Sequence, residues 1–460
     1  MDPRASARNG ARGSWLRRSG LEPVGRLVAW ALVAAWLGFW GALADARLRG
    51  PERAARRLRR SQKNVHRLVA QLGALKGLYA KAGQFASVRL DLLTGETRRA
   101  LESLQQSVAP IPVAAIRRII ESELGEPVES RFSSFDARPL GSASIGQVHR
   151  ATLPDATRVA VKVQYPWVAS SLRADLRIAR TALILLCWTT GRRIPDRKRL
   201  FEEFAASYAG ELNFESEARS AREIAGNLAG ESGVLVPRVF DEHSTRRVLT
   251  TSYIPTLPLD RQALLNRGIV PTAVLEIVAR AYAKQVFVDG IFHADPHPGN
   301  LFVLDAEESV HSPKVVFVDF GLSKRLDPAL REAMRQGLFA LIQRDADAFV
   351  RHMDAMKMIA PGAHGGVRRA VDAMFERIRQ AQEENRPEHA LGVAGAQIVG
   401  LQDEAKKLLQ DTPGLQLPND LLLYAKTLSY LFSLGERLAP EVDLVKISLP
   451  YLLRFLAGRA

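Results

Sequence analysis

The chain has 460 residues, 47% of them hydrophobic, and a formal net charge of +15. This composition excludes a disordered chain and leaves room for two or three compact units. The single cysteine, Cys187, excludes disulfide bonds within the chain and indicates a reducing compartment. Residues 1–63 contain 14 Lys or Arg against 4 Asp or Glu, so they hold two thirds of the net charge and favour an anionic partner surface.

An uncharged run of 18 residues, 27–44, lies within this basic region and contains Trp30, Trp36 and Trp40. As a helix it would be about 27 Å long, enough to cross the hydrocarbon core of a bilayer. Tryptophans and flanking arginines are typical interfacial anchors, so we expect a membrane-anchoring helix. The alternatives are a secretory signal, a helix lying in the interface and an organellar transit peptide.

Residues 53–69 continue as a basic helix beside this run. Its arginine cluster can face anionic headgroups or simply solvent. Aromatic residues that would stack on bases are not interleaved with the arginines, so we predict no nucleic-acid partner. A further helix is expected around Lys81 and Gln84, and another over residues 113–124.

A β-hairpin of small residues is predicted next, with Gly141, Ser142, Ala143 and Ser144 at its turn. Small residues let backbone N–H groups approach phosphates closely. The following strand, 158–163, contains Lys162 in a Val-Ala-Val-Lys pattern, the context in which a lysine meets the α- and β-phosphates of a nucleotide.

Lys162 needs a carboxylate partner from a helix, and one continuous helix is predicted over residues 201–228. Glu217 is the predicted ion-pair partner, while Glu211 and Asn213 would turn toward the nucleotide or form a solvated acidic face. Two strands, 236–240 and 248–253, should then lead to a hinge at which backbone groups of Ser252 and Tyr253 meet the adenine.

The motif with the most chemical content is His293-Ala294-Asp295-Pro296-His297-Pro298-Gly299-Asn300, followed by Asp319-Phe320-Gly321. Phosphoryl transfer needs a carboxylate near the attacking oxygen, here Asp295, and an Asn with a second carboxylate on Mg²⁺, here Asn300 and Asp319. Residues 301–304 and 314–318 read as a hairpin that would bring Asn300 and Asp319 together. The sequence contains no P-loop motif and no dinucleotide fingerprint.

The remaining third of the chain is predicted to be helical. Asp327 and Pro328 form an N-cap and first residue of a helix that runs to about Arg344. Further amphipathic helices are expected at 346–358, 367–384, 390–409, 418–434 and 447–456.

In this order the motifs resemble the UbiB-like (AarF) family of atypical kinase-like proteins, called ADCK proteins in animals. The resemblance runs from about Ser61 to the end. It implies an α+β, bilobal protein-kinase-like fold with an N-terminal helical extension and a mostly helical C-terminal lobe. The predicted segments are a basic segment (1–26), the anchoring helix (27–44), the helical extension (45–125), a kinase-like N-lobe (126–252) and a helical C-lobe (253–460).

The resemblance also implies roles for single residues. Lys81-Ala82-Gly83-Gln84 matches the family's K-x-G-Q motif, which lies over the active site, so Lys81 and Gln84 become functional candidates. Gly141 to Ser144 stand where the family has an alanine-rich loop. Glu211 matches the first acid of an E-x-D motif whose second acid is here Asn213, a residue that accepts hydrogen bonds without charge.

By resemblance, the chain is a membrane-associated atypical kinase or ATPase that binds ATP and Mg²⁺ and supports ubiquinone, other isoprenoid-quinone or lipid biosynthesis. Its implied partners are a membrane lipid or quinone intermediate and a quinone-biosynthesis complex. The favoured location is a bacterial inner membrane with the kinase domain facing the cytoplasm, with a mitochondrial membrane as the alternative. The alternative functions are a nucleotide-binding pseudokinase scaffold and a small-molecule kinase like the aminoglycoside phosphotransferases, whose loop shares the H-x-D-x-x-x-x-N pattern.

Overall fold

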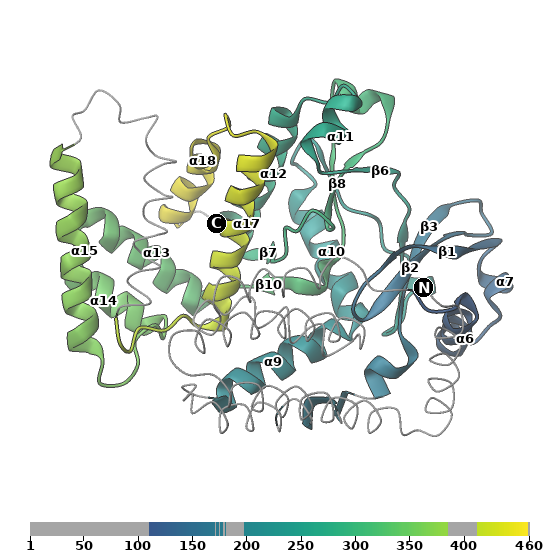
Figure 1. Cartoon of the computed structure of the whole chain (residues 1–460), viewed down its shortest axis with the longest axis horizontal. Helices are drawn as coiled ribbons and strands as arrows, with labels where there is room; N and C mark the ends of the chain where they lie inside the picture. The colour runs from purple at the N-terminus through teal and green to yellow at the C-terminus, as the bar shows by residue number, and fades with distance from the viewer. Residues whose placement is uncertain are drawn as a thin grey trace, which may run out of the picture. The chain divides into compact units, whose positions relative to one another are not determined.

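The computed structural model describes residues 110–170, 172–173, 175–177, 180, 197–384 and 412–458 (Figure 1). The predicted anchoring helix at 27–44, the Lys81–Gln84 motif and the helix predicted at 390–409 lie outside these residues. Within the described residues, no helix is long and apolar enough to span a bilayer.

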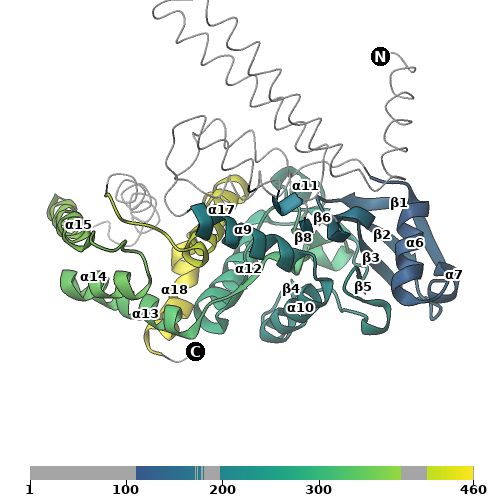
Figure 2. The ribbon, with the colours of Figure 1, turned by 90° about the horizontal axis from the view of Figure 1, so that it is seen from below.

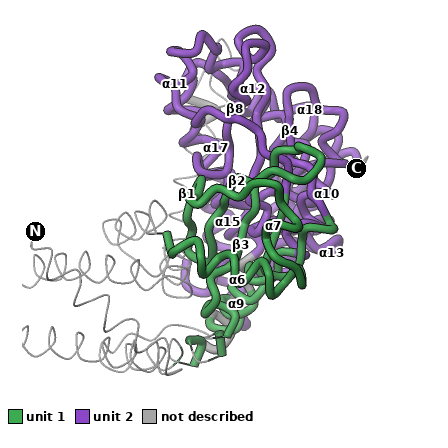
Figure 3. Tube along the Cα trace, turned by 90° about the vertical axis from the view of Figure 1, so that its right-hand side faces the viewer, with its two compact units in different colours: residues 1–214, 241–250 green, residues 215–240, 251–460 purple. Residues whose placement is uncertain are grey.

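The chain divides into two compact units (Figure 3). Unit 1 contains Met1–Phe214 and Asp241–Thr250, and unit 2 contains Glu215–Phe240 and Thr251–Ala460. Both units mix helices and strands, so the predicted α+β class is confirmed. The five segment boundaries given above stay predictions.

Unit 1 is built on an antiparallel hairpin pair. Strands β1 (Ser134–Ser142), β2 (Gly146–Thr152), β3 (Arg158–Gln164) and β5 (Val248–Ser252) form a sheet in the order β1-β2-β3-β5. The alternation predicted for β3 is confirmed, because Val159, Val161 and Val163 are fully buried while Lys162 is half-buried. Helix α6 (Val113–Leu124), which has the predicted bounds, lies close to β3 (Figure 2), and its isoleucines are buried. A short helix, α7 (Val128–Arg131), follows it.

The single helix predicted over 201–228 is wrong. The structure has two helices, α9 (Arg197–Glu211) and α10 (Phe214–Leu228), with a break at Leu212 and Asn213. At the break, Gln164 Nε2 donates to the Leu212 carbonyl (2.8 Å), and the Phe214 N–H donates to the Arg246 carbonyl (3.0 Å). Because these backbone groups are bonded outside the helix, the i to i−4 ladder cannot run through them.

Unit 2 contains the second four-stranded sheet, in the order β4 (Val234–Leu235), β9 (Val315–Phe317), β8 (Leu301–Leu304) and β6 (Thr256–Pro258). The predicted strand at 236–240 is not formed. Only β4 precedes it, and Val239 makes an isolated bridge to Thr251. Pro237 explains the interruption, since it has no N–H to donate to a ladder. Strands β7 (Ile291–His293) and β10 (Ser323–Arg325) form a separate antiparallel ribbon.

Helices make up the rest of unit 2, and most fall where the sequence predicts them. Asp327 caps α13 (Pro328–Gln343), because its Oδ1 accepts from the N–H groups of Ala329 (2.9 Å) and Leu330 (3.2 Å). The described helices of this unit, besides α10, are α11 (Arg261–Asn266), α12 (Pro271–Ala283), the π-helical turn η3 (Lys284–Asp289), the short 3-10 helices η4 (Glu307–Val310) and η5 (Phe320–Leu322), α13 (Pro328–Gln343), α14 (Ala346–Ala355), α15 (His364–Glu384), α17 (Asn419–Leu438) and α18 (Leu444–Leu456).

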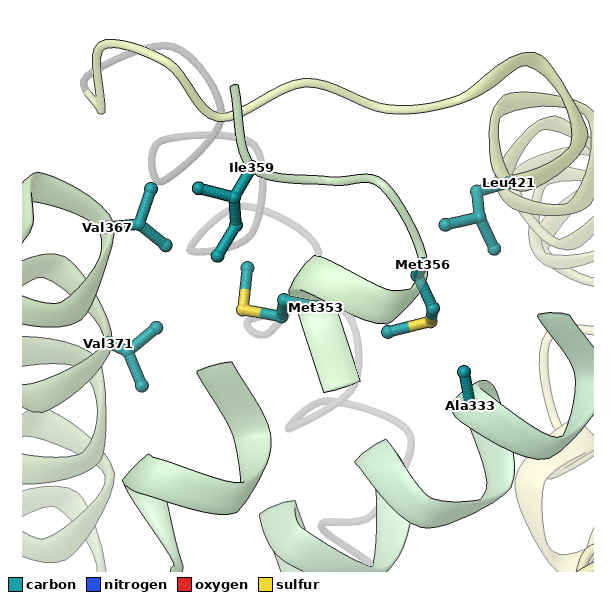
Figure 4. Close-up of a cluster of buried hydrophobic side chains, with 7 residues drawn as sticks. All are labelled: Ala333, Met353, Met356, Ile359, Val367, Val371 and Leu421. Atoms are coloured by element: carbon teal, nitrogen blue, oxygen red, sulfur yellow. The ribbon is translucent and has the colours of Figure 1, made fainter. Parts of the chain in front are cut away.

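A compact apolar cluster joins four elements of this helical part (Figure 4). It comprises Ala333, Met353, Met356, Ile359, Val367, Val371 and Leu421. Val367 and Val371 on α15 are fully buried, and Leu421 is the contribution of α17. The cluster therefore fixes the beginning of α17 against α13, α14 and α15.

Candidate active site

Hairpin β8–β9 brings the two predicted metal ligands together. Leu301 pairs with Phe317, and one step further the Val318 N–H donates to the Asn300 carbonyl (3.0 Å). Asn300 and Asp319 therefore leave the same end of the hairpin, as the sequence predicts. Asp319 adopts a left-handed conformation (φ +60°), which costs energy for a residue with a side chain and is found preferentially at functional sites.

Asn300 also binds Asp295. Its Nδ2 donates to the Asp295 carbonyl oxygen (3.1 Å) and to Asp295 Oδ2 (3.2 Å). With the amide nitrogen engaged in this way, Asn300 presents Oδ1 as its acceptor, and oxygen is the ligand that Mg²⁺ prefers. The loop thus supplies one fixed carboxylate and one amide oxygen.

His293 connects this loop to Val318, the residue between β9 and Asp319. The ring is fully buried, Nδ1 accepts from the Asp295 N–H (3.3 Å), and Nε2 lies 3.1 Å from the Val318 carbonyl. This pattern assigns the ring proton to Nε2, which donates to Val318. His293 is in turn held by Gln285, whose Oε1 accepts the His293 N–H (3.0 Å).

Gln285 was not predicted from sequence. It is fully buried in the π-helical turn η3, and its Nε2 donates to the Ala281 carbonyl (3.1 Å). Single π-turns are often found at functional sites, but a lone glutamine at the end of an apolar helix gives no sequence signal.

The Asp-Phe-Gly turn lies beside a second acidic side chain. A Cβ placed on Gly321 would be 3.2 Å from Asp319 Oδ1 and 3.5 Å from Glu217 Oε2, so both carboxylates border this glycine. Glu217 is buried, with 4% of its surface exposed, in the first turn of α10. Two carboxylates that border the same glycine, one of them buried, repel each other, and a nearby cation would offset that repulsion.

These residues fit Mg²⁺ as kinase-like sites hold it. Among the described residues, no group of three or more His, Cys, Asp and Glu side chains could enclose a metal. Mg²⁺, however, is usually bound through one or two carboxylates together with substrate phosphates and water. Asp319 and the Oδ1 of Asn300 provide such a partial ligand set.

In unit 1, Lys162 extends from β3 with its Nζ 5.1 Å from the centre of the Phe214 ring, a cation–π distance. The predicted phosphate loop is the turn between β1 and β2. The Ala143 N–H donates to the Gly146 carbonyl (2.8 Å), and a Cβ on Gly146 would lie 2.4 Å from the Val163 carbonyl oxygen. Only glycine therefore allows β2 and β3 to approach at this point.

The other predicted residues are less closely connected to this chemistry. Glu211 is the last residue of α9 and is 7% exposed. Ser252 is bonded to the Arg238 backbone, donating its N–H (2.8 Å) and accepting at Oγ (2.9 Å), and Tyr253 follows it. Lys162 belongs to unit 1 and Glu217 to unit 2, so their ion pair stays a prediction.

Lys426, on α17, is a second residue that the sequence patterns missed. Its Nζ is 3.2 Å from Asp295 Oδ1, and the two side chains are 14% and 18% exposed. The partners are 131 residues apart, and Lys426 follows an ordinary apolar stretch without a motif.

Comparisons with known proteins agree with this geometry. The model of a family described as the ABC1 atypical kinase-like domain matches residues 103–353. An uncharacterized protein of Synechocystis, sll0095, is 32% identical over 88% of this chain and 69% of its own length. A probable protein kinase UbiB from Aeromonas hydrophila is 31% identical, covering 82% of this chain and 68% of that protein.

A plant relative shows similar identity over a smaller share of its length. The chloroplastic protein ACTIVITY OF BC1 COMPLEX KINASE 8 of Arabidopsis thaliana is 30% identical over 83% of this chain. The chain spans only 52% of that plant protein. The function of such a relative as a whole protein therefore does not follow from the matched part alone.

Proposed function

The chain belongs to the ABC1 atypical kinase-like family, and from this premise we propose that it is an Mg²⁺-dependent, ATP-using atypical kinase or ATPase that supports isoprenoid-quinone or lipid biosynthesis at a membrane. The relatives named as kinases, one of them UbiB, support the phosphotransferase class. The uncharged run at 27–44 and the basic residues around it support work at a membrane.

The observation that carries the proposal is the meeting of Asp295, Asn300 and Asp319 at one end of β8–β9. Asn300 Oδ1 and the Asp319 carboxylate would hold Mg²⁺, which when bound neutralises charge on the phosphates of ATP. Asp295, fixed by Asn300, would orient the attacking oxygen of water or of an acceptor hydroxyl. Catalysis of this kind rests on positioning and charge, which a preformed loop supplies.

The remaining roles are those predicted from the sequence motifs and from the family resemblance. We assign the α- and β-phosphates to Lys162, with Glu217 as its partner, and backbone contacts to Gly141, Ser142, Ala143 and Ser144. We assign backbone contacts with the adenine to Ser252 and Tyr253. Glu211 is assigned a position facing the nucleotide. Lys81 and Gln84 are assigned to the segment that excludes protein substrates, which favours hydrolysis or a small acceptor over protein phosphorylation.

Substitution of Asp319 tests the proposal. In Asp319→Asn, ATP hydrolysis measured with membrane lipids present should fall by about 100-fold or more, because a carboxylate ligand of Mg²⁺ is lost. The matched control is Asp327→Asn, the same change eight residues on, where the amide oxygen still caps α13 and activity should persist. Hydrolysis that is unchanged in Asp319→Asn would overturn the proposal.

The biosynthetic role needs a separate experiment. Membrane quinones and lipids are profiled after deletion of the gene, and rescue is attempted with the wild-type chain and with Asp319→Asn. Normal quinones and lipids in the deletion strain would remove the pathway assignment. Rescue by Asp319→Asn would instead indicate a scaffold that works without turnover.

A further inference from the structure

The carboxylate of Asp295 is held from two directions. Asn300 Nδ2 is 3.2 Å from Oδ2, and Lys426 Nζ is 3.2 Å from Oδ1. Asn300 belongs to the same loop as Asp295, whereas Lys426 belongs to α17. Because both side chains of the Lys426–Asp295 pair are mostly buried, water screens the charges less than at a surface ion pair.

Helix α17 makes further contacts with the strands next to the loop that contains Asp295. Tyr424 packs edge-on against Phe292 with 6.0 Å between ring centres, inside an apolar cluster with Ala294 and Val286. Close to the beginning of the helix, Asp420 pairs with Lys324 of β10 at 2.6 Å, and β10 is the partner strand of β7. The helix is thus fixed to the segment that leads into Asp295.

One turn beyond Lys426, Tyr430 contacts the same loop. Its ring is 6.5 Å from that of His297, and Lys426 Nζ is 5.4 Å from its centre. Residues four apart share one helix face, so Lys426 and Tyr430 meet the loop together. His297 Nδ1 accepts the Gly299 N–H (3.0 Å), which holds the ring within the loop and beside Tyr430.

We propose that Lys426 is a positioning residue of the phosphoryl-transfer site: it fixes the second oxygen of Asp295 and balances its charge, so that the carboxylate orients the attacking oxygen. The inference rests on the proposed function and deepens it. The family match ends at residue 353, before α17 begins, and so assigns no role to this lysine. A misplacement of about 1 Å in such a site costs about 100-fold in rate.

The first test compares two substitutions. Lys426→Met keeps an unbranched side chain one atom shorter and removes the charge, and its kcat for ATP hydrolysis should fall by about 10- to 100-fold. The KM for ATP and the calorimetric Kd for Mg-ATP should stay within about twofold, because the lysine acts through Asp295 and not on the nucleotide. Lys426→Arg retains the charge and should recover a large part of kcat.

The matched control for this pair is Lys446→Met. Lys446 is an exposed lysine on the neighbouring helix α18, and its removal should leave kcat unchanged. A fall in kcat for Lys446→Met as large as that for Lys426→Met would show that loss of any lysine in these helices has the same effect, and would overturn the proposal.

A double-mutant cycle separates positioning from general structural support. If Lys426 acts through Asp295, then Lys426→Met should change kcat by less than about twofold in an Asp295→Asn background. Independent, multiplicative effects would overturn the proposal. The double variant also protects the test against misfolding, because it removes both charges of the pair instead of leaving one buried carboxylate without its partner.

The proposed function and this inference fail in different experiments. Unchanged hydrolysis in Asp319→Asn overturns the proposed function. A kcat for Lys426→Met within about twofold of the wild-type value, in a chain that Asp319→Asn inactivates, overturns the role of Lys426 alone.

Discussion

His149 shows how a single buried residue makes the sheet of unit 1 sensitive to pH. The ring is fully buried on β2, with Nδ1 2.8 Å from the Asp136 carbonyl and Nε2 2.8 Å from Gln147 Nε2. Nδ1 donates to Asp136 and Nε2 accepts from Gln147, so the arrangement requires the neutral ring. Burial lowers the pKa of His149, although Asp136 partly opposes the shift.

Stability should therefore fall in mild acid. The unfolded chain binds a proton on His149 below about pH 6.5, whereas the folded chain does not, so the stabilisation present above pH 6.5 is lost as the pH decreases. One such proton contributes a slope of at most about 1.4 kcal/mol per pH unit. Free energies of unfolding at pH 7.5 and 5.5 check this: His149→Gln should show a smaller difference than the wild type.

The exposed His311 provides the control. His311→Gln should retain the full pH dependence, because it leaves the buried His149 ring and its bonds to Asp136 and Gln147 intact. Equal pH dependence in His149→Gln and the wild type would contradict the interpretation.

Among single residues, the sequence predicted those within one local motif. The sequence singled out Asp295, Asn300 and Asp319, and the proximity of Asn300 and Asp319 was predicted, because a loop and the adjoining hairpin fix their spacing, whatever the rest of the fold does. Lys426 and Gln285 were not found, since their roles depend on which side chain a distant helix or a π-turn presents. Burial of a polar side chain is visible only in the folded chain.

At the scale of elements, some features follow from the local sequence pattern and others from tertiary contacts. Strand β3 was predicted from its alternation, which matches one buried face, and hairpin β8–β9 from two short apolar runs that pair with each other. The break between α9 and α10 was not, because Leu212 and Asn213 are tolerated in helices. Bonds from Gln164 and to Arg246 decide it, and both partners come from other parts of unit 1.

The cluster that anchors the beginning of α17 can be tested by its central methionine. Met353 on α14 is 2% exposed, so Met353→Ala should leave a cavity and cost about 2–5 kcal/mol in the free energy of unfolding. Met353→Leu nearly conserves the volume and should cost less than about 1.5 kcal/mol. Denaturant titrations of both variants check this, and equal losses would show that cavity formation is not the cause.

For the whole molecule, the uneven charge makes a prediction about membranes. Residues 1–63 hold most of the +15 net charge, so the chain should bind vesicles containing anionic lipids more tightly than neutral vesicles. A chain lacking residues 1–63 should lose this preference. Co-sedimentation at low and high salt measures it, because the electrostatic part weakens as the Debye length shortens. Equal binding of both chains would contradict the prediction.

The two units are interleaved along the chain. Unit 2 begins at Glu215, unit 1 returns for Asp241–Thr250, and unit 2 resumes at Thr251. No single cut therefore separates the sequence into the two units. Alternation and motifs locate strands and loops in the sequence. The assignment of a short segment such as Asp241–Thr250 to unit 1, however, depends on contacts between residues far apart in sequence.

The Lys426–Asp295 pair also sets an order of events during synthesis. Its partners are 131 residues apart, so the loop is translated long before the helix that holds its carboxylate. At typical ribosomal rates this delay is roughly 7–26 s, far longer than hairpin formation. A nascent chain can therefore contain the complete Asp295–Asp319 motif while its aspartate still lacks the lysine, and we expect full turnover to begin only after α17 has emerged and docked.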